Sequence, residues 1–258
     1  FFNGISCSSL FVSQVILPGN NLVGSLPWND LIESWSNSLV TFNLARNPSL
    51  KGTLPSEFGL MTNLKTLSLW ATSLSGSLPA ELSGCSSLET LLLYMNSLRG
   101  TLPAEWGGNE SFASSLTSLS LWNNQLTGTI PTSLGALTEL VTLGLDVNQL
   151  TGTFPTTFSQ LTNLSDLYLE HNQLEGDLDP LFCSPRGNEN LSTSWTILWS
   201  DCLGDSPEVN CSCCTACYDN AQCCYSPVKT NTDSSNGTSP VKSCVNFLDA
   251  PAISSYCL

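Results

Sequence analysis

The chain repeats one motif, L-x-x-L-x-L-x-x-N-x-L-x-G-x-[LIF]-P, and this repetition constrains the fold more than any other feature. Complete copies begin at Leu88, Leu116 and Leu140, and degenerate copies begin at Val12, Leu39, Leu64 and Leu164. The period of about 24 residues is typical of a solenoid. Each coil of a solenoid has an apolar side that only the next coil buries. The sequence therefore predicts one elongated domain.

The composition excludes one class of partner. Charged residues make up 11% of the chain, and 21 acidic against 7 basic side chains give a net charge of −14. No cluster of lysine or arginine could neutralise phosphates, which argues against nucleic-acid binding. The acidic surface leaves cationic partners, metal ions or simple solubility as its explanation.

The cysteine content indicates an oxidising compartment. The chain has 12 cysteines, too many for a reduced cytosolic protein without metal chemistry. No apolar run approaches the roughly 18 residues that a membrane span needs. Because the chain starts at Phe1, we expect that a signal peptide has been removed. An extracellular protein, secreted or the ectodomain of a cell-surface protein, is predicted, and N-x-[ST] glycosylation sequons stand at Asn109, Asn163, Asn190, Asn210 and Asn236.

Each coil is expected to contribute one short strand. Leucines of the L-x-L core should point inward, and strands of adjacent coils should pair in parallel into one sheet. A buried asparagine after each strand can satisfy backbone groups of its own and the neighbouring coil, forming a ladder. Thr72 replaces the asparagine in one coil, so that rung should be weaker. The predicted ladder consists of Asn20, Asn47, Asn96, Asn124, Asn148 and Asn172.

The G-x-[LIF]-P half of the motif resembles the plant-type leucine-rich repeat family over roughly residues 5 to 180. The resemblance implies an α/β-type solenoid, a right-handed superhelix with a parallel concave β-sheet, short second strands and convex 3₁₀ or loop segments. Two coils depart from the pattern. One has an extra residue after Asn47, and another has an insertion around residues 107–115 that should form a convex bump with the Asn109 sequon.

The ends of the chain differ from the repeats. Residues 1–11 resemble the remnant of the family's N-terminal cap, residues 12–182 form about seven coils, and residues 183–258 form a cysteine-rich C-terminal cap and tail. The last segment resembles the caps of secreted algal leucine-rich repeat proteins. Disulfides are expected among Cys183, Cys202, Cys211, Cys213, Cys214, Cys217, Cys223, Cys224, Cys244 and Cys257.

Two other cysteine chemistries were weighed. A thiolate metal site could use Cys211, Cys213, Cys214 and Cys217, but free thiolates would not persist in an oxidising compartment, so no metal is expected. Cys85 lies at a convex position where a small buried thiol packs well, and we expect it to be free.

The chain shows no catalytic constellation. His171 is its one histidine, and it lacks a G-x-S-x-G motif, a phosphate-binding glycine loop and H-E-x-x-H. Short coils also provide no deep pocket to raise the pKa of a carboxyl group. We therefore expect a binding protein that is not an enzyme and has no cofactor.

The candidate ligand site is a file of residues just after the L-x-L cores, where side chains should face the concave side. After Ala45 the file reads Trp70, Tyr94, Trp122, Asp146 and Glu170, with Asn123, Tyr168 and His171 nearby. One interpretation is that the rings only stack and stiffen the sheet. The other is a ligand surface, because aromatic residues anchor peptide and protein interfaces. Glycans at Asn163 and Asn190 would occupy one edge, so binding is placed over coils Leu39 to Leu145, reaching Glu170 at most.

A second file lies on another face. Small hydroxyl residues at strand spacing could match ice or a crystalline polysaccharide, or could simply suit a solvated strand. The file consists of Ser25, Thr53, Ser77, Thr101, Thr129 and Thr153, followed by Asp177.

Three functions follow in order of preference. The family resemblance implies a secreted or cell-surface recognition module that binds a peptide or protein ligand with a basic group, as a receptor-like ectodomain does. The second is a wall-associated inhibitor or polysaccharide binder, with carbohydrate as the ligand. The third is a structural or ice-binding protein that uses the serine and threonine file.

Overall fold

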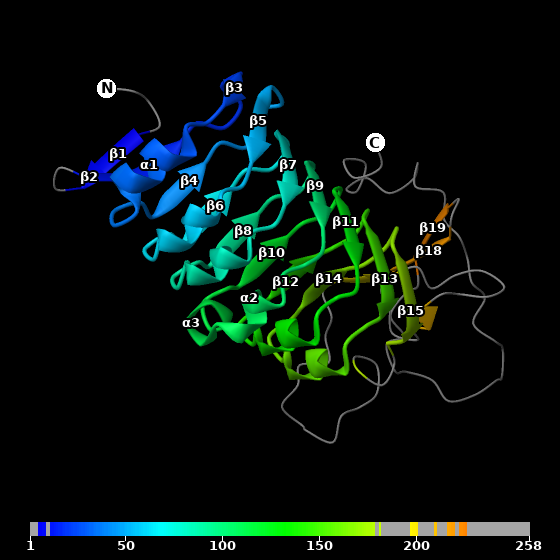
Figure 1. The fold of residues 1–258 in the computed structure, drawn as a ribbon. Helices are drawn as coiled ribbons and strands as arrows, with labels where there is room; N and C mark the ends of the chain where they lie inside the picture. Colours follow the sequence, from blue (N-terminus) through cyan, green and yellow to red (C-terminus); the bar gives the residue numbers. More distant parts are fainter. Residues whose placement is uncertain are drawn as a thin grey trace, which may run out of the picture.

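The computed structural model describes residues 5–8, 11–178, 181, 197–200, 209–210, 216–219 and 222–225. Side chains are described for residues 11–178, except residue 29, and for Leu181. Within these ranges the chain is a solenoid whose coils each contribute a strand to one or both of two sheets (Figure 1).

The larger sheet is built from the L-x-L cores. Equivalent residues of successive coils face each other in parallel, as Leu67 faces Leu91 and Leu119 faces Leu143. Every motif position therefore forms a straight file across the sheet, as the sequence predicts. In spatial order its strands are β1 (Ile5–Ser8), β2 (Phe11–Ile16), β4 (Thr41–Asn43), β6 (Thr66–Ser68), β8 (Thr90–Leu92), β10 (Ser118–Ser120), β12 (Thr142–Gly144), β14 (Asp166–Tyr168), β16 (Ile197–Ser200), β18 (Ala216–Asp219) and β19 (Gln222–Tyr225).

This sheet extends beyond the last copy of the motif. Strand β16 pairs in parallel with β14, and β18 pairs in parallel with β16. Both strands lie within residues 183–258, predicted to form the cysteine-rich cap, where the leucine motif does not predict them. At the two ends, β1 and β19 pair antiparallel with their neighbours, so the outermost strands run against the rest.

The smaller sheet confirms the predicted second strands but is sheared. Thr53 faces Ser75 and Thr153 faces Glu175, in each case two residues before the motif equivalent in the next coil. Equivalent positions therefore form a slanted file. The strands are β17 (Val209–Asn210), β15 (Gln173–Asp177), β13 (Gln149–Thr153), β11 (Gln125–Gly128), β9 (Ser97–Gly100), β7 (Ser73–Ser77), β5 (Leu50–Thr53) and β3 (Gly24–Ser25).

Short helices form the convex side (Figure 1). The 3₁₀ helices each begin directly after a proline, whose fixed φ and missing N–H suit a helix start. They are η1 (Ser56–Leu60), η2 (Ala80–Gly84), η3 (Thr132–Ala136) and η4 (Thr156–Gln160). The first coil instead has the α-helix α1 (Trp28–Trp35).

The predicted insertion forms two short helices, α2 (Glu105–Gly108) and α3 (Glu110–Ala113), between η2 and η3. Asn109 caps α3, its Oδ1 accepting hydrogen bonds from the backbone N–H of Ser111 (3.1 Å) and Phe112 (3.3 Å). The Trp106 ring is buried and its Nε1 donates to Pro79 O (3.2 Å). The insertion therefore packs into the convex row and adds to the core.

Rows of buried leucines from all coils form one continuous core between the two sheets and the convex helices. Cys85 belongs to this core and, among the residues with described side chains, is a free thiol, as predicted. Its Sγ lies 3.0 Å from Phe58 O, and burial raises the pKa of the thiol to about 12. Cys85 therefore behaves as a small apolar residue.

The asparagine ladder is confirmed. In one rung, Asn148 Nδ2 donates to Leu145 O of its own coil (3.0 Å) and Leu121 O of the preceding coil (3.1 Å), and Oδ1 accepts from Leu126 N (3.0 Å). Asn20 is the exception. Its exposed side chain donates only to nearby Pro18 O (3.0 Å), because no repeat coil precedes it.

The extra residue after Asn47 compensates for the asparagine that Thr72 replaces in the next coil. The extra residue after Asn47 closes a turn in which Leu50 N donates to Asn47 O (2.9 Å). In the other coils the equivalent backbone N–H donates to the side-chain oxygen of the ladder asparagine in the next coil. Because Leu50 N already has a partner, the next coil needs no asparagine at this position. Thr72 stands there and contacts only Leu69 O (2.9 Å) and Asn96 Oδ1 (2.7 Å). The rung has fewer hydrogen bonds, as predicted, yet the Leu50 N–H keeps its partner.

One residue before each ladder position adopts a left-handed backbone conformation. These residues have φ between 51° and 57° and are Arg46, Ala71, Met95, Asn123, Val147 and His171. Asparagine tolerates this conformation, whereas a β-branched residue is strongly disfavoured in it. Val147, with φ 52°, is therefore a strained position, and its side chain is 39% exposed.

We expect Val147→Asn to raise the free energy of unfolding by about 1 kcal/mol, because the left-handed strain falls and little burial is lost. Asn123→Val, the reverse change at the equivalent position one coil earlier, should lower it by about the same amount. Urea denaturation of the two variants measures both effects. Changes of the same sign in both variants would show that backbone strain does not control these positions.

Candidate functional site

The predicted aromatic file exists as a continuous stack. Trp70 and Tyr94 have ring centroids 5.0 Å apart with planes 12° from parallel, and Tyr94 and Trp122 are 4.8 Å apart at 13°. The spacing matches that of paired strands, because backbone bonds such as Met95 N to Trp122 O (3.0 Å) hold the coils in phase. The strand register therefore builds the stack.

Stacking determines what the rings present to a ligand. Tyr94 has both faces covered, by Trp70 on one side and Trp122 on the other. All three residues are half-buried, and the accessible part of Tyr94 is its ring edge. A row of edges offers an apolar strip along the solenoid axis, suited to an extended apolar segment.

The acidic half of the file differs from the prediction. Asp146 is half-buried beside Trp122, but Glu170 is buried, with only 4% of its surface exposed. The expectation of two accessible acids is therefore wrong for Glu170, because burial at a motif position depends on what covers that coil. Ala45, expected to face the concave side before Trp70, is also buried.

Asp146 has unusual electrostatics. Burial raises the pKa of its carboxyl group to about 7, although a hydrogen bond from its own backbone N–H opposes the shift. Asp146 Oδ1 and the Trp122 ring both lie close to Gly144. A Cβ built on this glycine would be 3.7 Å from the carboxylate oxygen and 3.6 Å from ring atom Cδ1. A carboxyl group kept at such an electrostatic cost is typical of a binding site.

Asp146 should make stability depend on pH. Its folded pKa of about 7 exceeds the unfolded value of about 3.9, so the folded state binds the proton more tightly, and stability falls as pH rises from about 4 to 7. Asp146→Asn should match the wild type at pH 4 and exceed it by about 2 kcal/mol at pH 8, after discounting for solvent screening. Urea unfolding at both pH values measures this difference. A difference independent of pH would contradict the buried carboxyl.

The remaining predicted site residues lie around the acidic end. Tyr168 is half-buried in β14, directly opposite Gly144 of β12. Asn123 and His171 are exposed and hold the left-handed positions beside Trp122 and Glu170. Tyr168, Asn123 and His171 therefore lie on the same coils as Trp122 and Glu170, next to the predicted file.

Two of the sequons have described side chains. Asn109 uses Oδ1 to cap α3, which leaves Nδ2 available for a glycan. Asn163 is exposed, and its Nδ2 donates to Thr138 O of the preceding coil (2.9 Å), an interaction that one remaining N–H could keep. The side chains of the other predicted glycosylation sites and of the predicted disulfide cysteines lie outside the described residues.

The serine and threonine file is exposed, and its packing explains its composition. The Thr53 and Thr101 methyl carbons lie 2.9 Å from where a Cβ on Gly76 or Gly128 of the next coil would stand. Both glycines have positive φ, 83° and 77°. The threonine methyl thus covers a glycine that the turn requires. Together with the slanted register, this contact favours a structural role for the file.

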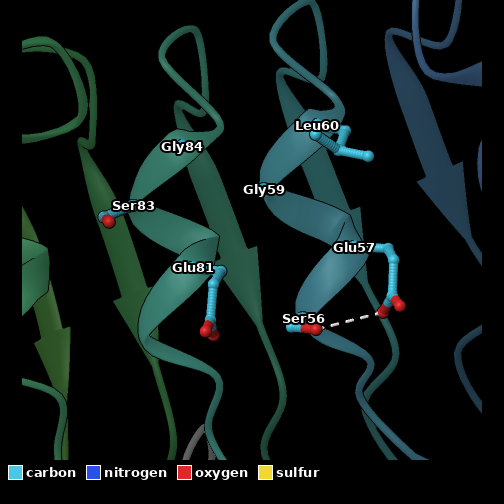
Figure 2. A pocket seen from close by; sticks show the side chains of 7 residues that line it. All are labelled: Ser56, Glu57, Gly59, Leu60, Glu81, Ser83 and Gly84. Atoms are coloured by element: carbon cyan, nitrogen blue, oxygen red, sulfur yellow. Dashed lines mark hydrogen bonds between the residues drawn. The ribbon is translucent and has the colours of Figure 1, made fainter.

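A hollow of about 480 Å³ opens on the convex side between η1 and η2 (Figure 2). Glu57 and Glu81 border it, and Gly59 and Gly84 allow the two helices to approach closely.

Among the described residues, no cluster of three or more histidine, cysteine or acidic side chains could hold a metal ion. Nor is any helix in the described segments long and apolar enough to cross a membrane.

Comparisons with known proteins agree with this architecture. Family models described as leucine rich repeat match residues 63–85 and 114–174. The crystal structure of a pollen receptor kinase 3 is 31% identical, with 72% of this chain and 84% of that chain covered and a TM-score of 0.58. A search of curated proteins found no match. The repeated motif, the two sheets and these matches together show that the chain belongs to the leucine-rich repeat family.

Two further solved structures are similar to this chain, and one of them is a receptor kinase ectodomain in a complex. One is the ectodomain of the plant membrane receptor kinase GASSHO1/SCHENGEN3 from Arabidopsis thaliana in complex with CASPARIAN STRIP INTEGRITY FACTOR 2, 26% identical over 81% of this chain and 29% of that chain, with a TM-score of 0.56. The other is the crystal structure of PEPR1-AtPEP1, 29% identical over 64% of this chain and 26% of that chain, with a TM-score of 0.51. The chain spans less than a third of the length of several receptor structures that it matches.

Proposed function

We propose that this protein is an extracellular, non-enzymatic recognition module that binds an extended peptide, or a segment of a protein, on its concave face. The apolar part of the ligand lies along the edges of Trp70, Tyr94 and Trp122, and a basic group lies at Asp146. The observation that carries the proposal is the continuity of three stacked rings with a half-buried carboxyl group of raised pKa.

Stiffening of the sheet alone accounts for only part of this arrangement. Stacked rings contribute about 1 kcal/mol per pair and need no ligand. Asp146, however, lowers the stability of the folded state when it is ionised, and a purely structural file has no need of a carboxyl group there. A ligand cation beside Asp146 would offset its desolvation. The net charge of −14 would also speed encounter with a basic ligand.

The geometry also weighs against the two alternative functions. Sugar-binding platforms use open ring faces, whereas here neighbouring rings cover both faces of Tyr94. The serine and threonine file has a structural explanation without a crystalline ligand, because the Thr53 and Thr101 methyl groups pack over glycines of the next coil. The similarity to a receptor kinase ectodomain solved in complex with CASPARIAN STRIP INTEGRITY FACTOR 2 favours a peptide or protein ligand.

A random peptide library displayed on phage, selected against the full chain, tests the proposal. Selected peptides should be rich in apolar residues with a lysine or arginine nearby. Trp122→Ala should weaken their binding about 30-fold, equivalent to about 2 kcal/mol for a central anchor. Circular dichroism checks that the variant remains folded.

The double variant Thr101→Lys and Thr129→Lys is the matched control, because it places two bulky charges on the other sheet. Peptide binding should survive in it. Peptides that tolerate Trp122→Ala but are lost in the double variant would move the site to the serine and threonine file. Selection of no peptide, together with binding on a glycan array, would favour the polysaccharide function.

A further inference from the structure

The large apolar side chains beside the concave sheet alternate between two rows. One row is the aromatic file, and the other is the left-handed row, whose residues directly follow those of the file in each coil. In the aromatic file the two tryptophans, Trp70 and Trp122, lie two coils apart. In the left-handed row the exposed apolar residues Met95 (41% exposed) and Val147 (39%) also lie two coils apart, each one coil after a tryptophan. The four side chains therefore form a zigzag that repeats every two coils.

The length of this repeat matches one kind of peptide backbone. Hydrogen bonds such as Met95 N to Trp122 O (3.0 Å) and Ala71 N to Tyr94 O (3.0 Å) hold successive coils at the spacing of paired strands. At about 4.8 Å a coil, two coils span about 9.6 Å. A polyproline II helix repeats every three residues, or about 9.3 Å. A ligand in this conformation would present the same side to the protein at every second coil.

The indole N–H groups of the two tryptophans have the same spacing. Neither Nε1 atom donates to another residue in the described part of the chain, and neither is among its buried polar atoms that lack a partner. Both N–H groups are therefore accessible donors, two coils apart. The carbonyl groups of a polyproline II helix have no hydrogen bonds within the helix, and equivalent ones recur about 9.3 Å apart. Two such carbonyl groups could accept from Trp70 and Trp122 together.

We propose that the ligand segment on the concave face is a proline-rich polyproline II helix with one basic residue, which rests on the proposed function and specifies the conformation of its peptide. Ligand residues three apart contact Trp70 and Trp122, and the residues between them contact Met95. Asp146 lies in the same file, one coil beyond Trp122. The basic side chain therefore stands one or two residues further along the ligand.

Other backbone conformations match this surface less well. Side chains of a β-strand return to the same side every two residues, about 6.7 Å, which corresponds to neither one coil nor two. The carbonyl groups of an α-helix are bonded within the helix and cannot accept from the indole donors. Proline-rich segments dock on aromatic-lined surfaces, because their preformed conformation loses little entropy on binding.

The residue at position 147 supports an apolar contact in the left-handed row. Val147 has φ 52°, a conformation that asparagine tolerates and a β-branched residue disfavours. Asn123 occupies the equivalent position one coil earlier, where the zigzag has no member in this row. An exposed valine kept at a conformational cost indicates a contact with a group outside the chain.

Nuclear magnetic resonance titration of the full chain with short peptides, acetylated and amidated at their ends, tests the proposal. Pro-Pro-Ala-Pro-Pro-Ala-Lys and its reverse, Lys-Ala-Pro-Pro-Ala-Pro-Pro, place the basic residue after or before the prolines, because a three-residue repeat fits in either direction. At least one should shift the indole N–H resonances of both Trp70 and Trp122. The control, Val-Thr-Val-Thr-Val-Thr-Lys, has the same length and charge but favours a β-strand, and should bind at least about tenfold more weakly.

Two variants examine the two rows separately. Trp122→Phe keeps an aromatic ring in the stack but removes the N–H donor, and should weaken binding of the proline-rich peptide about fivefold. Met95→Ser removes an exposed apolar contact and should have an effect of about the same size. Ala71→Ser is the matched control in the left-handed row, since Ala71 is not part of the zigzag, and should leave the Kd unchanged. Circular dichroism confirms that the variants fold.

Equal binding of the strand-forming peptide, or no shift of the indole resonances with either proline-rich peptide, would overturn the proposal. An unchanged Kd in folded Trp122→Phe and Met95→Ser would do the same. Phage-selected peptides that depend on Trp122 but do not contain prolines three residues apart would leave the proposed function standing without the polyproline II conformation.

Discussion

Asn124→Leu is expected to lower the free energy of unfolding by about 4 kcal/mol, the largest effect of any substitution considered for this protein. Asn124 Nδ2 donates to Leu93 O (3.1 Å) and Leu121 O (2.9 Å), and Oδ1 accepts from Leu98 N (3.0 Å). Leucine has a similar volume but leaves the Leu98 N–H without its partner, and it removes one of the two side-chain hydrogen bonds at Leu93 O and at Leu121 O, which keep Asn96 and Asn148. Each lost hydrogen bond costs about 1–3 kcal/mol. Urea denaturation followed by tryptophan fluorescence measures the change.

Asn20→Leu is the control, because Asn20 holds the same motif position at the open N-terminal end. Its exposed amide bonds only with Pro18 O, so the substitution should change stability by less than about 0.5 kcal/mol. Equal losses in the two variants would show that the ladder does not hold the coils together.

Gly59→Ala is expected to lower the free energy of unfolding by about 3 kcal/mol. Its added Cβ would lie 2.2 Å from Glu81 O and 3.0 Å from Glu81 C. Both atoms belong to the backbone of η2, so the clash can be relieved only by separating two coils (Figure 2). Thermal melting and urea unfolding measure the loss.

The control, Gly108→Ala, has the opposite expected sign. Nothing lies within 4 Å of its added Cβ, and alanine is the better helix former, so a gain of up to roughly 1 kcal/mol is expected at the end of α2. If Gly59→Ala also stabilised the protein, the close approach of η1 and η2 would not depend on a glycine.

The sequence by itself determined the architecture and the position of the candidate site. The leucine period defines the coil, because each coil buries its apolar side only against the next. The in-phase strands then place equivalent residues in files, so Trp70, Tyr94 and Trp122 could be grouped from motif position alone. The buried Asn148 and the free thiol of Cys85 follow from the same positional logic.

The sequence could not reveal what depends on contacts between coils. Glu170 is buried although its motif position predicts an exposed side chain, and the pKa of Asp146 is raised by burial. Strands beyond the last motif copy, such as β16, pair with the sheet although they lack the leucine pattern.

The physical reason lies in the range of the interactions. Periodicity, turn residues and strand propensity act within one coil and can be read along the chain. Desolvation, stacking and the satisfaction of buried polar groups involve residues about 24 positions apart that meet across neighbouring coils. The compensation between the extra turn at Asn47 and the missing asparagine at Thr72 is of this second kind. The repeat therefore set the scaffold, and only the stacking of coils decided the electrostatics and shape of the concave site.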